Sequence, residues 1–237
     1  MSFYRWTSVC AGLWSRAVPR LRASLYFACT GVRFRRIGAH AKIRGAHRMQ
    51  IGSRVALGDF CWIEAVERYG DGQFLPELSI GDDVAISDLT HISCVRRISI
   101  GAGCLLGSKI YIGDHSHGST RNYAQMKHLA PAARPLDDAA EIVIGERVWI
   151  GDGAVILAGA QIAAGSILGA NCVASLRVER PALIAGIPAR VIRYLDDGED
   201  ILQGASSPGV TGSTTYADTG PVGPSCRTGS GITRSEV

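Results

Sequence analysis

The 237-residue sequence lacks any cysteine pair at the two-residue spacing that zinc sites and redox motifs use. Its seven cysteines are scattered, at positions 10, 29, 61, 94, 104, 172 and 226. No cluster of histidines accompanies them at zinc-finger spacing. The sequence therefore predicts neither a structural metal site nor a disulfide framework, and it favours a reducing compartment.

Long apolar runs are also missing. The uncharged stretch from Trp6 to Ser15 is shorter than the roughly 18 residues that a membrane-spanning helix needs, and arginines follow it. A weak signal peptide is an alternative interpretation. Charged residues make up only 19% of the chain and apolar residues 46%, which excludes a wholly disordered protein. Arginines and aromatic residues gather before residue 37, which predicts a local surface contact and no nucleic-acid groove.

A repeat of six residues dominates the sequence. An aliphatic residue, usually followed by glycine, recurs in five runs: Ile37 and Ile43; Ile51, Leu57 and Ile63; Ile80, Ile86 and Ile92; Ile100, Leu106 and Ile112; and Ile144, Ile150, Ile156, Ile162 and Leu168. The fourth residue after each is mostly small or apolar. A period of six fits neither a helix nor a simple alternating strand, and indicates a β-solenoid whose short strands point the aliphatic residue inward.

Two consequences follow for the small residues. Glycines are expected at the corners, where a positive φ or the absence of a Cβ is needed. Cys61, Cys104 and Cys172 fall at the small-residue position and are predicted to be core thiols.

Interruptions divide the chain. Long ones span about 65–78 and 115–141, and slips of two residues separate Ile43 from Ile51 and Ile92 from Ile100. Residues 3–29 predict a helix with a break near Pro19, which either caps the first coil or contacts a membrane surface. We expect an N-terminal helical segment over 1–34, an all-β solenoid domain over 35–195 and a disordered, flexible tail over 196–237.

The closing coils carry a family resemblance. The segment IVIGERVWIGDGAVILAGAQIAAGSILGANCVASLRVERPALIAGIPARVIR, residues 142–193, resembles the end of hexapeptide-repeat acetyltransferases. These include galactoside and maltose O-acetyltransferases, streptogramin acetyltransferases and enzymes that acetylate surface polysaccharides. The IGxxVWIG and AGxPARVIR motifs carry the likeness. It implies a left-handed parallel β-helix, a homotrimer, and acetyl-CoA bound between subunits as co-substrate.

The resemblance implies a histidine base, which removes the proton of the attacking hydroxyl. The matching segment is YIGDHSHGS, and the family pattern places the base at His115, with His117 as the alternative. Adjacent residues of an extended chain project to opposite faces, so Asp114 is expected to be a poor partner for orienting the ring, and a backbone carbonyl is an alternative. No cysteine relay is needed.

Other site residues also come from the resemblance. Contacts with coenzyme A are expected at Trp149, Asp152, Ala170 and Ser175, at Arg177 in place of a usual lysine, and near the phosphates at Arg190 and Arg193. Asp88 resembles a position that binds the acceptor. The loop residues Arg121, Asn122 and Tyr123 offer further contacts with a saccharide.

The sequence thus favours an O-acetyltransferase acting on a sugar hydroxyl, with a saccharide or lipid-linked precursor of surface polysaccharide as acceptor. We expect it in the cytoplasm, at the inner face of the membrane. Serine or an antibiotic is an alternative acceptor. A γ-class carbonic anhydrase, with zinc on His91, His115 and His117, and a non-catalytic scaffold are the alternatives of other classes; Asp152 stands where the anhydrases carry a histidine.

Overall fold

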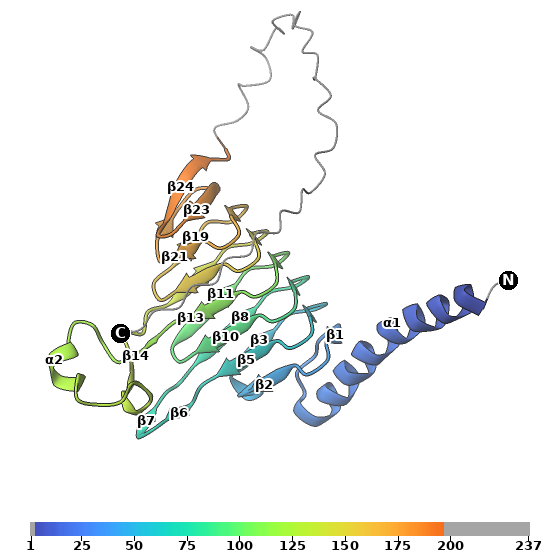
Figure 1. Ribbon diagram of the computed structural model, residues 1–237, viewed down its shortest axis with the longest axis horizontal. Coiled ribbons are helices and arrows are strands. Elements are labelled where there is room, and N and C mark those ends of the chain that lie inside the picture. The colour runs from blue at the N-terminus through green and yellow to red at the C-terminus, as the bar shows by residue number, and fades with distance from the viewer. Residues whose placement is uncertain (1–2, 197–237) are drawn as a thin grey trace, which may run out of the picture. The chain divides into compact units, whose positions relative to one another are not determined.

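The computed structural model describes residues 3–196, and the side chains from Trp14 onward. These residues form a parallel β-helix preceded by one long helix, α1 (Phe3–Thr30) (Figure 1). The chain divides into two units, Met1–Glu199 and Asp200–Val237, and the second lies outside the described residues. The flexible tail expected there stays a prediction.

The chain winds through three parallel sheets, which we call A, B and C, and each coil contributes one strand to each sheet in that order. Sheet A contains β1 (Arg36–Ile37), β4 (Ala56–Leu57), β9 (Ala85–Ile86), β12 (Leu105–Leu106), β17 (Trp149–Ile150), β20 (Ile167–Leu168), β23 (Ala182–Gly186) and β24 (Ala189–Tyr194). Within sheet A, β24 is the one antiparallel strand and pairs with β23.

Sheet B contains β2 (Lys42–Arg44), β5 (Trp62–Ala65), β10 (His91–Cys94), β13 (Tyr111–Gly113), β18 (Val155–Leu157) and β21 (Val173–Ala174). Sheet C contains β3 (Met49–Ile51), β8 (Glu77–Ile80), β11 (Arg97–Ile100), β16 (Ile142–Ile144), β19 (Gln161–Ile162) and β22 (Arg177–Val178). Each strand pairs with its counterpart one coil away, so Ile63, Ile92 and Ile112 stand in one inward row.

The core is built from the aliphatic residues of the repeat. Ile63, Ile92, Leu106 and Ile156 are fully buried, and burial of such a side chain stabilises a fold by about 1.5–3 kcal/mol. Cys61, Cys104 and Cys172 are buried free thiols, as predicted.

The glycines that follow the aliphatic residues are explained by close approach and not by φ. A Cβ on Gly151 would lie 2.6 Å from the backbone nitrogen of Ala170 in the next coil. Several corner positions with a positive φ are instead occupied by residues other than glycine, such as Leu89 with φ 61° and Asn171 with φ 58°. Asparagine tolerates this region better than most residues, whereas leucine is uncommon there.

All interruptions of the repeat leave the solenoid at one edge, between sheets B and C, which we call the B–C edge. The first slip is a short helix, η1 (Ala46–Arg48), and the first long interruption is a hairpin of β6 (Arg68–Tyr69) and β7 (Gly72–Gln73). The second long interruption contains β14 (Ser116–His117), α2 (Tyr123–Met126), η2 (Pro131–Ala133) and β15 (Leu136–Asp137). The hydroxyl of Tyr69 donates to the carbonyl oxygen of Ala132 at 2.7 Å, which joins the two excursions.

The N-terminal helix continues through Pro19, so the expected break is absent. Its C-terminal half packs on the first coil: Ala23 is buried, and the ring of Tyr26 lies 5.9 Å from that of Phe34. Trp14, Leu21 and Leu25 are exposed. One face of α1 therefore covers the end of the solenoid, as the capping hypothesis expected, and another apolar face remains uncovered.

Candidate functional site

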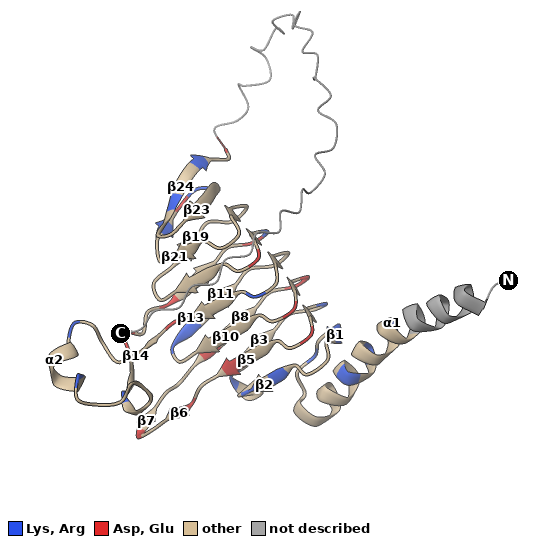
Figure 2. Ribbon diagram, in the orientation of Figure 1, with Lys and Arg blue, Asp and Glu red and all other residues tan. Residues whose placement is uncertain are grey.

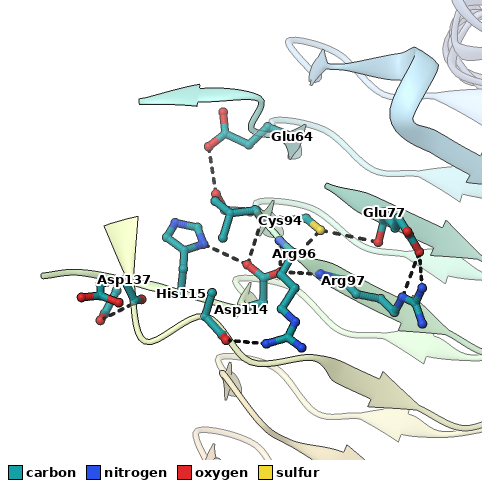
Figure 3. A network of polar contacts seen from close by, with 12 residues as sticks. Glu64, Glu77, Cys94, Arg96, Arg97, Asp114, His115 and Asp137 are labelled. Carbon is teal, nitrogen blue, oxygen red and sulfur yellow. Dashed lines mark hydrogen bonds and ion pairs between the residues drawn. The ribbon is translucent and has the colours of Figure 1, made fainter. Parts of the chain in front are cut away.

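Asp114 and His115 form a pair directly after β13, at the B–C edge. The two atoms Asp114 Oδ1 and His115 Nδ1 lie 3.0 Å apart, and the side chains are 0% and 7% exposed (Figure 3). The prediction that Asp114 would be a poor partner for the ring is wrong. Strand β13 ends at Gly113 and the chain bends at Asp114, so the alternation of an extended chain no longer applies there.

The turn between β10 and β11, one coil before Asp114, holds the carboxylate of Asp114 in place. Oδ1 accepts from the backbone amide of Val95 at 2.9 Å, and Oδ2 accepts from the amides of Arg96 and Arg97 at 2.8 and 2.9 Å. Burial raises the pKa of Asp114, but the hydrogen bonds from His115 and from these amides outweigh burial, so the pKa lies below its usual value. The ionised carboxylate selects the His115 tautomer with its proton on Nδ1, which leaves Nε2 as the basic atom.

Cys94 completes the buried cluster as a weak donor. Its thiol lies 3.5 Å from Asp114 Oδ2. Burial and the neighbouring negative charge of Asp114 raise the pKa of the Cys94 thiol strongly. A protonated, buried thiol is a poor nucleophile.

Sheet B presents further polar side chains one and two coils below the pair. Glu64, Ser93 and Gly113 stand in one outward row of β5, β10 and β13. The hydroxyl of Ser93 donates to Glu64 Oε1 at 3.1 Å, and Trp62 Nε1 donates to Glu64 Oε2 at 2.9 Å. Sequence analysis missed Glu64 and Ser93. The position after each inward isoleucine of sheet B is the signal that could have found them.

His91 lies in a neighbouring row, between two aromatic rings. Its ring stacks on Trp62 at 4.5 Å and meets Tyr111 edge-on at 5.4 Å. Burial lowers the pKa of His91, and the charge of His115 adds to this effect against the opposing influence of Glu64. Its Nε2 is buried, lies 3.7 Å from Glu64 Oε1 and makes no hydrogen bond. A neutral, unsatisfied imidazole nitrogen therefore lies near the Asp114–His115 pair.

The excursion after His115 contributes exposed residues. His117 lies edge-on to Tyr69 at 5.1 Å. Arg121 Nε lies 3.8 Å from Asp138 Oδ1, Asn122 precedes α2, and the ring of Tyr123 lies under the guanidinium of Arg134. The structure keeps these residues in one loop on the B–C edge.

Three of the residues expected to contact coenzyme A lie on other surfaces of the chain. Trp149 is 52% exposed on sheet A. Asp152 and Ala170 follow at the edge between sheets A and B, which we call the A–B edge, and Asp152 Oδ1 accepts from the backbone amide of Ser108 at 2.8 Å. A single chain therefore does not bring these residues to the edge that carries His115.

The remaining residues expected to contact coenzyme A lie on different surfaces of the chain. Ser175 is exposed after β21 and so shares the B–C edge with His115, two coils further along. Arg177 Nε lies 3.7 Å from Glu179 Oε1 on sheet C. Arg190 and Arg193 are exposed on β24, the closing strand of sheet A.

Asp88 is a corner residue of the A–B edge. Its Oδ1 accepts from the backbone amide of Asp59 at 2.7 Å, just as Asp59 Oδ1 accepts from that of Ala39. The same bond recurs at Asp152. Asp88 thus links neighbouring coils, and it does not share the B–C edge with His115 in one chain.

His91, His115 and His117, the histidines weighed for zinc, do not form a three-ligand group among the described residues. Among the side chains that the structure describes, those of residues 14–196, no group of three or more from histidine, cysteine, aspartate or glutamate is placed to hold a metal ion.

Comparison with known proteins identifies the repeat. Residues 141–174 match the family described as bacterial transferase hexapeptide (six repeats). Galactoside O-acetyltransferase of Escherichia coli (strain K12) is 39% identical over 194 residues, which cover 75% of this chain and 89% of that protein. WbbJ of the same strain, described as an O-acetyl transferase of lipopolysaccharide biosynthesis, is 37% identical over 114 residues, 47% of this chain. The chain spans 58% of the length of WbbJ.

A solved structure shares the fold. A mutant of AntD, an N-acyltransferase from Bacillus cereus, was determined with dTDP-4-amino-4,6-dideoxyglucose and coenzyme A. It superposes with a TM-score of 0.55 at 16% identity, over 72% of this chain and 88% of that one. The expected fold class, a left-handed parallel β-helix with an N-terminal helix, is confirmed. With its six-residue period, its closing coils and these relatives, the chain belongs to the hexapeptide-repeat acetyltransferase family.

Proposed function

We propose that the chain is an O-acetyltransferase that moves an acetyl group from acetyl-CoA to a hydroxyl of a saccharide, as the free sugar or as a lipid-linked precursor of surface polysaccharide. The observation that carries the proposal is the His115 ring, whose Nδ1 is held by the buried carboxylate of Asp114. A base with a fixed tautomer and a free Nε2 fits the activation of an alcohol. The names of the two Escherichia coli relatives support the reaction class.

The reaction proceeds in two proton transfers. Nε2 of His115 takes the proton of the acceptor hydroxyl as its oxygen attacks the thioester carbonyl carbon. The tetrahedral intermediate then expels the thiolate of coenzyme A, and His115 Nε2 donates the proton that it took from the acceptor to this thiolate. Asp114 stays ionised and stabilises the imidazolium between the two steps. The products are an O-acetyl ester and free coenzyme A, and Cys94 forms no acyl intermediate.

The coenzyme A contacts require a second chain. Trp149, Asp152 and Ala170 lie on sheet A or the A–B edge, whereas His115 lies on the B–C edge. In a threefold assembly, the A–B edge of one chain can face the B–C edge of the next. A homotrimer would therefore complete three equal sites, with Ser175, Arg177, Arg190 and Arg193 along the closing coils toward the nucleotide.

The test is release of free coenzyme A thiol with a panel of sugars, nucleotide sugars, serine and an antibiotic alcohol. His115→Ala should lower kcat by about 10²- to 10⁴-fold, the usual contribution of a positioned base. His117→Ala, two residues away and exposed, is the matched control and should keep most of the activity. Equal activity of wild type and His115→Ala would refute the proposal, and the preferred member of the panel decides between a sugar and the other alcohols.

The uncovered face of α1 supports the proposal that the chain contacts the cytoplasmic face of the membrane. Trp14, Leu21 and Leu25 are 73%, 60% and 59% exposed and share one face at helical spacing, and the helix sequence contains no acidic residue. Arg16 and Arg20 lie on the other side of the helix, around a cavity that Ala56 and Ala85 also line. An exposed apolar helix face without acidic residues suits the surface of an anionic bilayer. No helix among the described residues is long and apolar enough to cross a membrane.

Leu21→Gln with Leu25→Gln should abolish co-sedimentation with phosphatidylglycerol vesicles while thiol release in solution continues. If these substitutions leave the sedimented fraction unchanged, the contact is refuted.

A further inference from the structure

An outward row of side chains runs down sheet B from the candidate site to the first coil. Tyr111, His91, Trp62 and Lys42 are direct neighbours across β13, β10, β5 and β2. The rings of Tyr111, His91 and Trp62 touch in sequence. Because each coil rises by about 4.8 Å, the row extends about 14 Å from the level of Tyr111 to that of Lys42.

Cations gather at the far end of this row. Lys42 Nζ lies 5.3 Å from the ring centre of Trp62, and the guanidinium carbon of Arg44 lies 5.8 Å from it. Both residues are exposed, and neither forms an ion pair with any residue that the structure describes. Figure 2 shows this positive charge on β2. Arg22 of α1 joins them around a cavity of about 420 Å³ that no acidic residue lines.

The carboxylate that pairs in register with Arg44 is held by other partners. Glu64 is the direct neighbour of Arg44 across β2 and β5, but its oxygens lie against Ser93 and the indole nitrogen of Trp62. Its charge is therefore directed toward His91 and the His115 end. The row has a hydrogen-bonding end beside His115 and an uncompensated cationic end two to three coils away.

We propose that Lys42, Arg44 and Arg22 bind a phosphate or diphosphate group of the acceptor, while Trp62, His91 and Tyr111 line the path of the saccharide between this anion and His115. The inference rests on the proposed function and specifies its acceptor. Guanidinium and ammonium groups are the usual protein partners of phosphate oxygens. The distance along the row places the phosphate about 10–15 Å from the hydroxyl that receives the acetyl group. Acceptors of this kind are sugars linked to a nucleoside diphosphate or to a lipid diphosphate.

The first experiment measures binding and needs no catalysis. Inorganic pyrophosphate is titrated into the full chain by calorimetry, with Lys42→Gln, Arg44→Gln and their double variant. Each loss of a charged hydrogen bond should weaken binding by about tenfold. Arg54→Gln is the matched control, because Arg54 is also exposed but pairs with Asp83 at the edge between sheets C and A. Equal affinity of wild type and the double variant overturns the proposal.

The second experiment separates the acceptors. Thiol release is compared for the same sugar in free form, as a nucleoside diphosphate sugar and as a short-chain prenyl diphosphate sugar. The double variant should raise KM for the diphosphate forms by about tenfold with little change in kcat, and it should leave the free sugar unaffected. The form with the lower wild-type KM identifies the source of the phosphate, and the same KM for free and diphosphate forms overturns the proposal.

The two failures are distinguishable. If wild type releases no thiol with any acceptor while Lys42→Gln still weakens pyrophosphate binding, the proposed function fails and the anion site stands. If His115→Ala abolishes transfer while Lys42 and Arg44 affect neither pyrophosphate nor KM, the reverse holds.

Discussion

Asp114 determines how His115 is presented, although only the histidine meets the substrate in the proposed reaction. Three backbone amides and the imidazole saturate its carboxylate, which is fully buried. An asparagine of the same shape would turn an NH₂ group toward one of these donors. Asp114→Asn should therefore disturb both the tautomer of His115 and the corner formed by Val95 and Arg96.

We expect Asp114→Asn to lower kcat by about 10²-fold or more while KM for acetyl-CoA changes little, because the substitution affects the base and not the binding surface. Steady-state thiol release measures both constants. The double variant Asp114→Asn, His115→Ala should be no slower than His115→Ala alone, since the two residues act as a unit. An additive loss would contradict that view.

The lowered pKa of Asp114 also predicts a pH dependence of stability. A carboxyl whose pKa is lower in the folded state stabilises the fold above its unfolded value of about 3.9, and this contribution is lost as the pH falls through the folded value. The free energy of unfolding should therefore decline below about pH 4. In Asp114→Asn this part of the decline should be missing, although the variant is less stable at pH 7. Urea titrations between pH 2 and 7 measure both, and parallel curves would count against the assignment.

At the scale of the strand, the six-residue period was sufficient to predict which side chains form the core. Leu105 and Leu106 are neighbours in β12, yet Leu105 is 47% exposed and Leu106 is 0% exposed. Leu106→Ala should cost about 2–5 kcal/mol of unfolding free energy, because it removes buried methyl groups and leaves a cavity. Leu105→Ala is the matched control and should cost about 0.5 kcal/mol or less in the isolated chain. Similar losses for both would contradict the inward and outward assignment.

The candidate site was predicted less completely than the core. His115 was found because a motif and the end of a repeat mark it. Glu64 and Ser93 each follow an inward isoleucine of sheet B, so the period predicts that they point outward, but it does not predict that they pair, because the register across two irregular corners decides this. Asp88 was predicted to contact the acceptor; in one chain its carboxylate accepts from the backbone of Asp59 in the A–B edge, so the contact with an acceptor stays a prediction. Contacts between side chains of successive coils can be identified only from the three-dimensional structure.

At the scale of the whole molecule, the separation of His115 from Trp149 leads to a test by mixing. Sedimentation should give three times the 25.1 kDa of the chain. Chains with His115→Ala and chains with Trp149→Ala should each be weak alone. After joint refolding, activity should return, because some sites then combine an intact edge from each partner. A mixture no better than its components would show that one chain supplies the whole site.

The antiparallel return of β24 along β23 makes the end of sheet A unlike a further coil. A parallel solenoid offers its last strand as a template for another strand, and in sheet A that place is already taken. Deleting the chain from Ile187 onward would uncover the backbone of β23, and light scattering should then detect filaments or aggregates that grow with concentration. Deletion from residue 197 onward leaves β24 in place and should leave the protein dispersed. On this view the last strand of the motif AGIPARVIR limits the length of the β-helix, so that it ends as a discrete molecule and does not continue as a fibre.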